Sequence, residues 1–373
     1  MIHPLMNNIL LHKLAQHWGV VQQELIPQLT TELGPLSGPL LTVVRILEWA
    51  RIEDFVERRG CGIGRPLKDR EALARAFVAK VVLHLPTAEA LRERLQMDRT
   101  LQRICGFDSR KPVPDAATFS RAFAEMASGR VGERCHQALI DAHLGDQLIG
   151  HITRDGTAIV AREKPKAAGG KTVVAPKYSR GRPKKSESRP APEPTRLQQQ
   201  LTQTLEEMVR DLPRQCDRGC KSNAQGYRNS WNGYKLHFDV ADGGIPISVV
   251  LTRASVHDSQ AALPLALMTS ARVTSLYDVM DAAYCSTEIR EHSRSLGHVP
   301  LIDHNPRRGE KSEFAPHEAE RYKIRTQSER ANARLKDEFG ADKIYVRGGA
   351  KVMAHLMFGV LALSVDQLLR LLT

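Results

Sequence analysis

Tyr322-Lys-Ile-Arg325-Thr-Gln-Ser-Glu329-Arg-Ala-Asn-Ala-Arg-Leu-Lys336 is the stretch that constrains the fold and chemistry of this chain most strongly. We expect it to be helical, and the four numbered residues have offsets of 0, 3, 7 and 14. At about 100° per residue they fall near 0°, 300°, 340° and 320°, within an arc of about 60°. Two cations around one carboxylate on so narrow a face are not typical of a solvated surface. This stripe could hold a metal ion and a phosphate together.

The other two faces of the same helix have different characters. Ile324, Ala331, Leu335 and Phe339 lie opposite the stripe and are expected to pack on a sheet or its neighbours. A third face is basic and carries Lys323, Arg330 and Arg334. Two interpretations of the basic face stay open, namely plain solvation and contact with a nucleic-acid backbone.

The charge of the chain predicts a polyanionic partner. The 373 residues carry a formal net charge of +12, which points to nucleic acid first and an anionic membrane surface second. Residues 162–189 hold ten basic and two acidic residues, an excess of +8. Within them Arg180-Gly-Arg182-Pro-Lys184-Lys185 resembles the core of an AT-hook, which binds the narrow minor groove of A·T-rich DNA. The alternative is a flexible charged linker.

The same sequence gives the expected compartment. It opens without the pattern of a signal peptide, and its longest apolar stretch, Leu356–Val365, is too short to span a bilayer. Six scattered cysteines do not form a disulfide framework. We therefore expect a cytoplasmic, nucleoid-associated protein with no membrane partner.

The pattern of apolar residues divides the chain into two parts. Residues 1–146 are predicted to form a helical N-terminal DNA-binding domain, with Asp69, Thr87 and Asp115 as helix N-caps. Residues 147–373 are predicted to form a second domain, which a basic insertion or linker at about 163–225 interrupts. One amphipathic helix, Leu197–Leu212, is expected inside that insertion.

The second part alternates strands and helices. Its expected order is a strand at 147–153, the insertion, a hairpin of 234–240 and 245–252, then a helix, a strand at 276–280, a helix, a strand at 299–302 and further helices. This order predicts an α/β (α+β mixed) fold, a mixed sheet with flanking helices.

Three carboxylates occupy marked places in this scheme. Asp155 is expected to end the first strand and Asp281 a later one, while Glu329 belongs to the stripe. A single Asp at a strand end is more often a turn or cap residue, but three converging acids suit hard divalent cations. Asp278 and Asp258 are alternatives for the second acid. Asp278 points to the opposite face of its strand, and Asp258 is a candidate supporting group.

The spacing Tyr-x2-Arg-x3-Glu-x6-Lys resembles the signature of DDE-type insertion-sequence transposases. Asp155-Gly-Thr and the Asp281-Ala-Ala-Tyr284 segment are similar to the surroundings of that family's two aspartates, although many relatives have Gly where Ala283 stands. Gly233–His237, Ala254–Ser259, Gly64–Pro66 and Thr118–Arg121 also resemble family segments.

This resemblance implies an RNase H-like catalytic domain in which Asp155, Asp281 and Glu329 are catalytic and bind Mg²⁺, with Mn²⁺ as a possible substitute. Tyr322, Arg325 and Lys336 would hold the DNA strand near the cut. The implied partners are double-stranded DNA, as element ends and target, and a second copy of the chain in a homodimer on DNA. Two alternatives stay open: an RNase H-like nuclease without strand transfer, and a non-catalytic transposase-derived DNA-binding protein.

Overall fold

The computed structural model describes residues 18–27, 35–57, 69–108, 110–165, 193–222, 226–306 and 310–372 of the chain. The AT-hook-like residues Arg180, Arg182, Lys184 and Lys185 lie outside these ranges, as does the segment Gly64–Pro66. Predictions that concern them are therefore not addressed by the structure.

The N-terminal part is helical, as the sequence predicted. Thr87 caps its helix by accepting a hydrogen bond from the Ala90 amide at 3.0 Å, and Asp115 accepts one from the Thr118 amide at 2.6 Å. Asp69 precedes a helix but has a left-handed backbone and makes no capping bond, so its predicted capping role is wrong. The elements are η1 Val21–Leu25, α3 Gly38–Ala50, η2 Ile52–Phe55, α4 Arg70–Val82, α5 Ala88–Met97, α6 Arg99–Cys105, α7 Ala116–Ser128 and α8 Val131–Leu144.

A mixed sheet follows these helices, and it has seven strands within the described residues. The order β4-β3-β1-β5-β6 forms its body; β1 is antiparallel to β3 and parallel to β5. This confirms the predicted fold class, an RNase H-like mixed sheet after a helical region. The strands are β1 Leu148–Ala161, β2 Asp217–Ser222, β3 Arg228–Ala241, β4 Ile245–Arg253, β5 Thr274–Met280, β6 Val299–Ile302 and β7 Lys343–Ile344.

Gly233 stands where strand β3 changes its partner from β2 to β4. The first half of β3 pairs with β2 and the second half with β4, both on the edge away from β1. Gly233 stands at the change with φ +153°, and a Cβ there would lie 2.1 Å from the Ile159 carbonyl oxygen. A side chain at this position would therefore push β1 and β3 apart.

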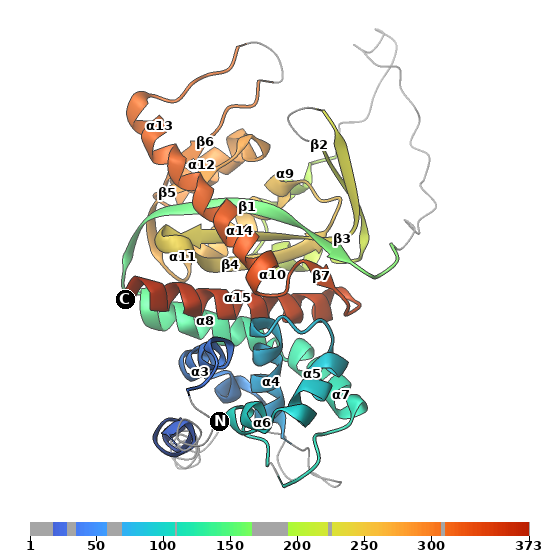
Figure 1. Cartoon of the computed structure of the whole chain (residues 1–373). Coiled ribbons are helices and arrows are strands. Elements are labelled where there is room, and N and C mark those ends of the chain that lie inside the picture. Colours follow the sequence, from blue (N-terminus) through green and yellow to red (C-terminus); the bar gives the residue numbers. More distant parts are fainter. Residues whose placement is uncertain are drawn as a thin grey trace.

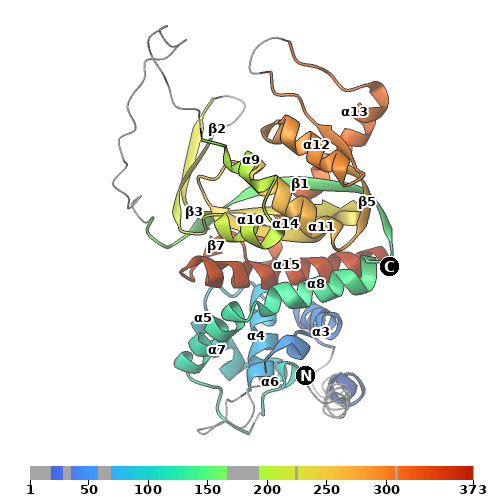
Figure 2. The ribbon, with the colours of Figure 1, turned by 180° about the vertical axis from the view of Figure 1, so that it is seen from behind.

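Helices cover both faces of the sheet. In Figure 1, α14 crosses in front of β1, and the view from behind in Figure 2 shows α10 and α11 over the opposite face. The remaining elements are α9 Arg196–Gln200, α10 Leu205–Asp211, η3 Asp242–Gly244, η4 Asp258–Ala261, α11 Ala262–Ser270, η5 Ala282–Tyr284, α12 Thr287–Ser295, α13 Pro316–Tyr322, η6 Lys323–Arg325, α14 Thr326–Glu338 and α15 Gly349–Leu372.

Two predicted helices differ from the structure. The helix expected at Leu197–Leu212 is two short helices, α9 and α10, because Thr204 caps the second with a capping box. The helix expected to run from Tyr322 through Lys336 tightens to a 3₁₀ turn, η6, between α13 and α14. Of the expected apolar face, Ala331, Leu335 and Phe339 are in the core, whereas Ile324 lies in η6 and is only half-buried.

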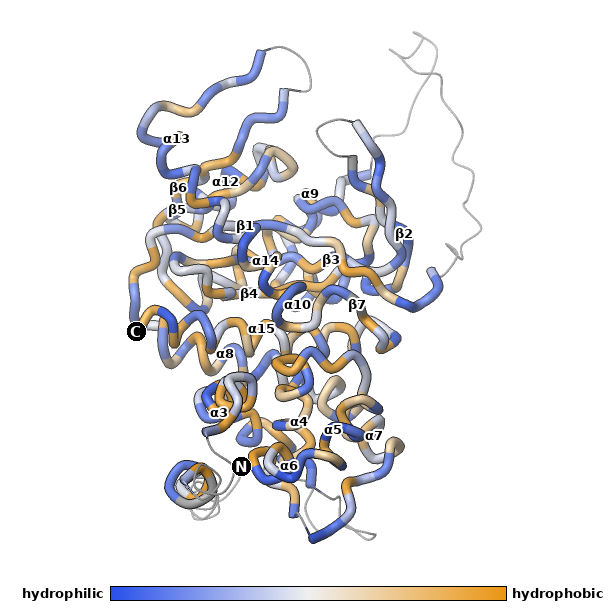
Figure 3. The backbone as a smooth tube through the Cα atoms, viewed as in Figure 1, coloured by the Kyte–Doolittle hydropathy of each residue, from blue (hydrophilic) through white to orange (hydrophobic). Residues whose placement is uncertain are grey.

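Helix α15 lies between the N-terminal helices and the sheet. It contacts α3, α4, α7 and α8 on one side and β4 and α14 on the other, and Figure 1 shows it beside α8 under the sheet. Apolar residues concentrate along it in Figure 3. By length and composition α15 could cross a membrane, yet 78% of its most apolar window is buried inside the protein. It is thus the shared core helix of the two predicted parts.

A buried ion pair fixes the centre of the sheet. Arg154 on β1 donates from Nε and Nη2 to the two carboxylate oxygens of Asp239 on β3, each at 2.7 Å. Both side chains are almost fully buried, and Thr269 on α11 donates to the same carboxylate at 2.7 Å. Bidentate geometry of this kind satisfies a buried charge only while both partners are present.

We predict that Asp239→Asn destabilises the protein by about 3–5 kcal/mol, since it leaves the Arg154 guanidinium buried without a counter-charge. The double variant Arg154→Met/Asp239→Leu should recover most of that loss because it removes both charges. Urea unfolding of the three proteins measures the two differences. A loss below about 1 kcal/mol for Asp239→Asn would contradict the role given to this pair.

Candidate functional site

Asp155 lies where β1 loses one of its two neighbours. The parallel pairing of β1 with β5 ends at Arg154 and Met280, whereas the antiparallel pairing with β3 continues past Asp155 to Val160. Asp155 therefore stands inside a long strand, and the prediction that it ends the strand is wrong. The physical reason is that β3 extends β1 on one side while β5 stops on the other side at this residue.

Asp281 comes directly after the last residue of β5. Because Arg154 pairs with Met280, the next residues along the two parallel strands, Asp155 and Asp281, emerge at the same edge. Asp281 caps the turn η5 by accepting a hydrogen bond from the Ala283 amide at 2.9 Å. Ala283 thus contributes a backbone donor to this carboxylate.

Both aspartates have raised pKa values. Burial is the main cause and raises the pKa of Asp155 to about 6, and the negative charges of Asp281 and Asp258 act in the same direction. Burial also raises the pKa of Asp281, with the charge of Asp258 again adding to it. Carboxylates that are desolvated and repelled by a neighbouring acid are short of positive charge, which is the electrostatic condition that a bound cation would relieve.

Asp258 is the further acid near this edge. It accepts a hydrogen bond from the Lys235 amine at 2.8 Å, and its carboxylate lies 3.7 Å from Nδ1 of the buried His237. Gly156 gives it room, because a Cβ there would stand 2.8 Å from His237 Nδ1 and 2.9 Å from Asp258 Oδ1. The glycine of the Asp-Gly-Thr motif is therefore required by close packing behind Asp155.

Glu329 is not gathered with these acids. Its carboxylate accepts a hydrogen bond from Arg325 at 2.6 Å, and its side chain is 50% exposed. Within the described ranges, no three His, Cys, Asp or Glu side chains are grouped closely enough to hold a metal ion. The structure thus brings Asp155 and Asp281 to one edge and leaves Glu329 paired with the neighbouring cation of its own stripe.

Asn332 is a site residue that the sequence reasoning missed. Its Nδ2 donates to Asp155 Oδ2 at 2.8 Å, and its own Oδ1 is buried without a hydrogen-bond partner among the described residues. The signal was present, since Asn332 follows Glu329 by three residues and so shares its side of the helix. This amide ties α14 directly to β1.

The other residues of the stripe surround the aspartates. Arg325 and Lys336 both feel the negative charge of Asp155, and Lys221 on β2 acts on Asp155 and Asp281 from another side. Burial raises the pKa of Tyr322 to about 12, and its ring packs against Phe314 with centroids 4.8 Å apart. Arg325, Lys336 and Lys221 therefore face the acidic edge.

The basic face of the helix has two separate environments. Arg330 is exposed and donates to Thr326 Oγ1 at 3.1 Å. Arg334 instead joins α14 to α15, because it donates to Glu338 and to Asp366, each at 2.6 Å from Nη2. DNA contact by these two arginines stays a prediction, and for Arg334 it would compete with these internal ion pairs.

Packing accounts for two further side chains, Asp278, which was an alternative for the second acid, and Trp231. Asp278 is buried and accepts hydrogen bonds from Ser293 at 2.5 Å and from His298 at 3.1 Å, so its carboxylate serves the packing of β5 against α12. Trp231 donates from its indole to the Tyr234 carbonyl at 3.0 Å and packs over Gly219. Both have structural partners that account for them.

Comparison with known proteins gives two family matches. The family model described as Transposase DDE domain matches residues 205–365, and the one described as Transposase domain (DUF772) matches residues 27–125. The first range includes Asp281 and the whole stripe but begins after Asp155. No curated protein and no solved structure matches the chain.

The raised pKa of Asp155 predicts that this residue lowers the stability of the fold at high pH. The folded-state pKa of about 6 lies above the ordinary 3.8. The contribution of Asp155 to the free energy of unfolding is therefore favourable at low pH and is lost as the pH rises through 6. Asp155→Asn should therefore be more stable than the parent at pH 8 without divalent ions, by about 1 kcal/mol. The two should converge near pH 4. Thermal unfolding of both proteins across this pH range measures the difference in stability. A difference that does not change with pH would contradict the raised pKa of Asp155.

Proposed function

The chain belongs to the DDE transposases of insertion sequences, and we propose that it binds the terminal inverted repeats of its own element and catalyses metal-dependent DNA cleavage and strand transfer. The observation that carries the proposal is the strand register, which brings Asp155 and Asp281 out at one edge of the sheet beneath the stripe. A DDE domain indicates an enzyme of the polynucleotidyl-transferase type. In strand transfer, the 3′-hydroxyl of a cut element end would attack a phosphodiester of the target DNA, so that one phosphodiester bond forms as another breaks.

The donor set fits Mg²⁺, with Mn²⁺ as a substitute. Asp155 and Asp281 offer hard carboxylate oxygens, and their raised pKa values indicate a site short of positive charge. Glu329 would be the third ligand once it leaves Arg325. When bound, divalent ions supply an activated nucleophilic oxygen and stabilise charge on the leaving oxygen.

The side chains of the stripe have roles that follow from their present contacts. Arg325 pairs with Glu329, and a DNA phosphate would offer that guanidinium an alternative partner of equal charge. The exchange would free the carboxylate of Glu329 at the moment when DNA arrives. Asn332 would keep α14 in place on β1 through its bond to Asp155. Tyr322 and Lys336 would position the strand, and no side chain is needed as a nucleophile.

The remaining parts would serve recognition. The helical residues 1–146 would recognise the element ends, and the basic segment at 162–189 would add salt-sensitive affinity for DNA. We propose a homodimer on paired ends as the acting form, on chromosomal DNA in the cytoplasm.

Two rival functions predict different products. An RNase H-like nuclease would cut DNA but would not join a cut end to a target. A non-catalytic DNA-binding derivative would do neither. Burial, together with the charge of Asp258, raises the pKa values of Asp155 and Asp281 at this edge, which weighs against that derivative. A strand-transfer assay with a pre-cut element end separates the three.

We predict that Asp281→Asn and Glu329→Gln each reduce Mg²⁺-dependent cleavage and strand transfer by at least about 10³-fold, because each removes a charged oxygen ligand. DNA binding without metal should be retained. The substrate is linear DNA that carries the gene with both flanking regions, and products are resolved on denaturing gels.

The matched control is Asp278→Asn, which makes the same chemical change at a buried aspartate of β5, three residues before Asp281. It should lower stability while the folded fraction keeps its activity, because the Asp278 carboxylate is bonded to Ser293 and His298. Full cleavage by Glu329→Gln would show that this carboxylate is not a catalytic ligand.

A further inference from the structure

Lys80 is a buried cation outside the acidic site. It lies near the end of α4, in a stretch from Ala72 to Val82 that is buried on every side, and only 7% of it is exposed. Burial lowers the pKa of its amine to about 8, so the group still carries its charge at neutral pH. A buried charge is ordinarily paired, since desolvation without a partner is costly.

The amine of Lys80 has no such partner among the described residues, where neither an ion pair nor a side-chain hydrogen bond is formed with it. Burial alone accounts for its lowered pKa. Its titratable neighbour is His355 on α15, whose imidazole bonds the Gly340 carbonyl at 2.9 Å and whose pKa is lowered by burial and by the charge of Lys80. His355 is therefore neutral at pH 7, and the charge of Lys80 has no counter-charge beside it among the described residues.

Lys80 lines a cavity of about 410 Å³ between α4, the end of α14 and α15. This volume is within the range of ligand sites. Lys336 of the stripe lines the same cavity, and so does the exposed Tyr345. The acids Asp337 and Asp342 also line it, and both act on the pKa of Lys336 rather than on that of Lys80.

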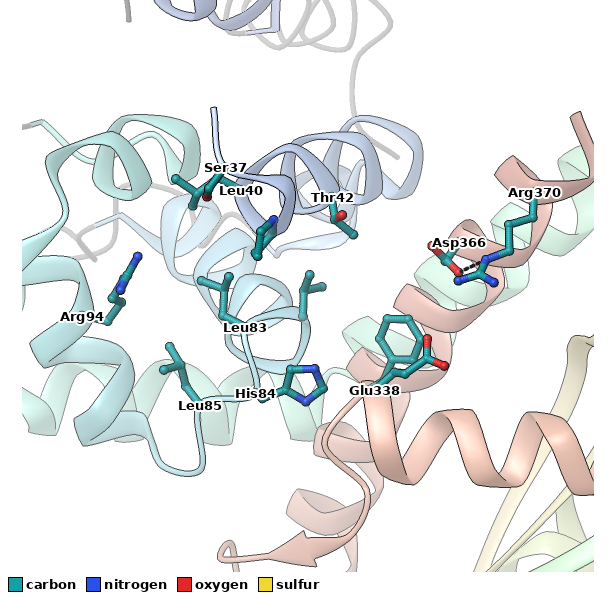
Figure 4. Close-up of a pocket in the computed structure, with 13 residues that line it drawn as sticks. Ser37, Leu40, Thr42, Leu83, His84, Leu85, Arg94, Glu338, Asp366 and Arg370 are labelled. Atoms are coloured by element: carbon teal, nitrogen blue, oxygen red, sulfur yellow. Dashed lines mark hydrogen bonds and ion pairs between the residues drawn. The ribbon is translucent and has the colours of Figure 1, made fainter. Parts of the chain in front are cut away.

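A neighbouring cavity shows the contrast. Figure 4 shows it lined by Leu83, His84 and Leu85, with Glu338 and the Asp366–Arg370 ion pair opposite. The two arginines that line it are matched within the protein, Arg370 by Asp366 and Arg94 by Asp98. An anion would have to displace these carboxylates, so the Lys80 cavity is the better suited of the two.

His84, like Leu85, lines both cavities. Its backbone has φ +54°, a left-handed conformation that costs a non-glycine residue about 1 kcal/mol. Such strain is retained where the surrounding structure fixes it, often beside functional sites. The exposed imidazole of His84 adds a third basic group at the Lys80 cavity.

We propose that this cavity binds a backbone phosphate of DNA, with Lys80 and Lys336 as its two cations. Lys336 feels the charge of Asp155 and also lines the cavity. A strand that leaves the aspartates would pass Lys336 and reach Lys80 on α4. The inference rests on the proposed function and adds to it a phosphate site shared by the helical N-terminal part and the DDE domain.

The test uses the full-length protein and a fluorescently labelled DNA duplex, without divalent metal, over a series of salt concentrations. Lys80→Met should weaken binding about tenfold at low salt and reduce the slope of log K against log salt by about one, as expected for one lost phosphate contact. The free protein should not lose thermal stability, because the variant removes a buried charge that burial disfavours. Lys80→Arg should restore most of the affinity.

Two further variants keep the result decisive. Lys80→Gln replaces Lys80→Met if the latter does not fold. Lys351→Met removes one charge from α15 outside the cavity and should leave the salt slope nearly unchanged. The proposal would be overturned if Lys80→Met and Lys80→Gln both bound DNA with unchanged affinity and an unchanged salt slope. It would also be overturned if they bound more weakly but with an unchanged salt slope. If the parent protein binds and cuts DNA in that case, the proposed function stands without this site, whereas a parent that neither binds nor cuts would refute the function itself.

Discussion

The ion pair between Arg154 and Asp239 sets the geometry on which the acidic edge depends. It locks β1 to β3 at the residue just before Asp155, and the sulfur of Met280 on β5 contacts the same guanidinium at 3.4 Å. The Arg154 guanidinium therefore joins the strands β1, β3 and β5 and fixes their relative positions. A shift of β1 by one residue would turn Asp155 to the opposite face of the sheet. The position of the first aspartate is thus fixed by a charge that never meets solvent.

The site has its acidic side chains on the sheet and its basic side chains on the elements around them. Burial and neighbouring acids keep the pKa values of Asp155 and Asp281 raised, even though Arg325, Lys336 and Lys221 approach them from η6, α14 and β2. The tight ion pair of the stripe joins Arg325 of η6 to Glu329 of α14. Such an arrangement has charges of both signs available for a substrate that is itself anionic and arrives with cations.

Much of the fold was predictable from the sequence, because local signals and tertiary packing agree there. The strand Val299–Ile302 was predicted with its observed bounds, and the N-caps Thr87 and Asp115 were predicted correctly. The end of the first strand was misjudged because Gly156 and Thr157 resemble a turn, whereas their conformation is set by pairing with His237 and Leu236 of a distant strand. Asn332 and Lys80 escaped notice for a similar reason. Their significance depends on what lies across from them, and helical periodicity describes only one element at a time.

The position of α15 has a consequence for how the chain folds. The N-terminal helices end with α8 at Leu144, yet the apolar surface they present is covered by a helix that begins at Gly349. The ribosome must produce the whole sheet between these points before that surface can be closed. Folding of the helical part is therefore tied to contacts of very long sequence separation, which slow folding and prolong the exposure of apolar side chains. Assembly of this protein is expected to finish only after synthesis of α15, with its two halves completing their shared core in a single late step.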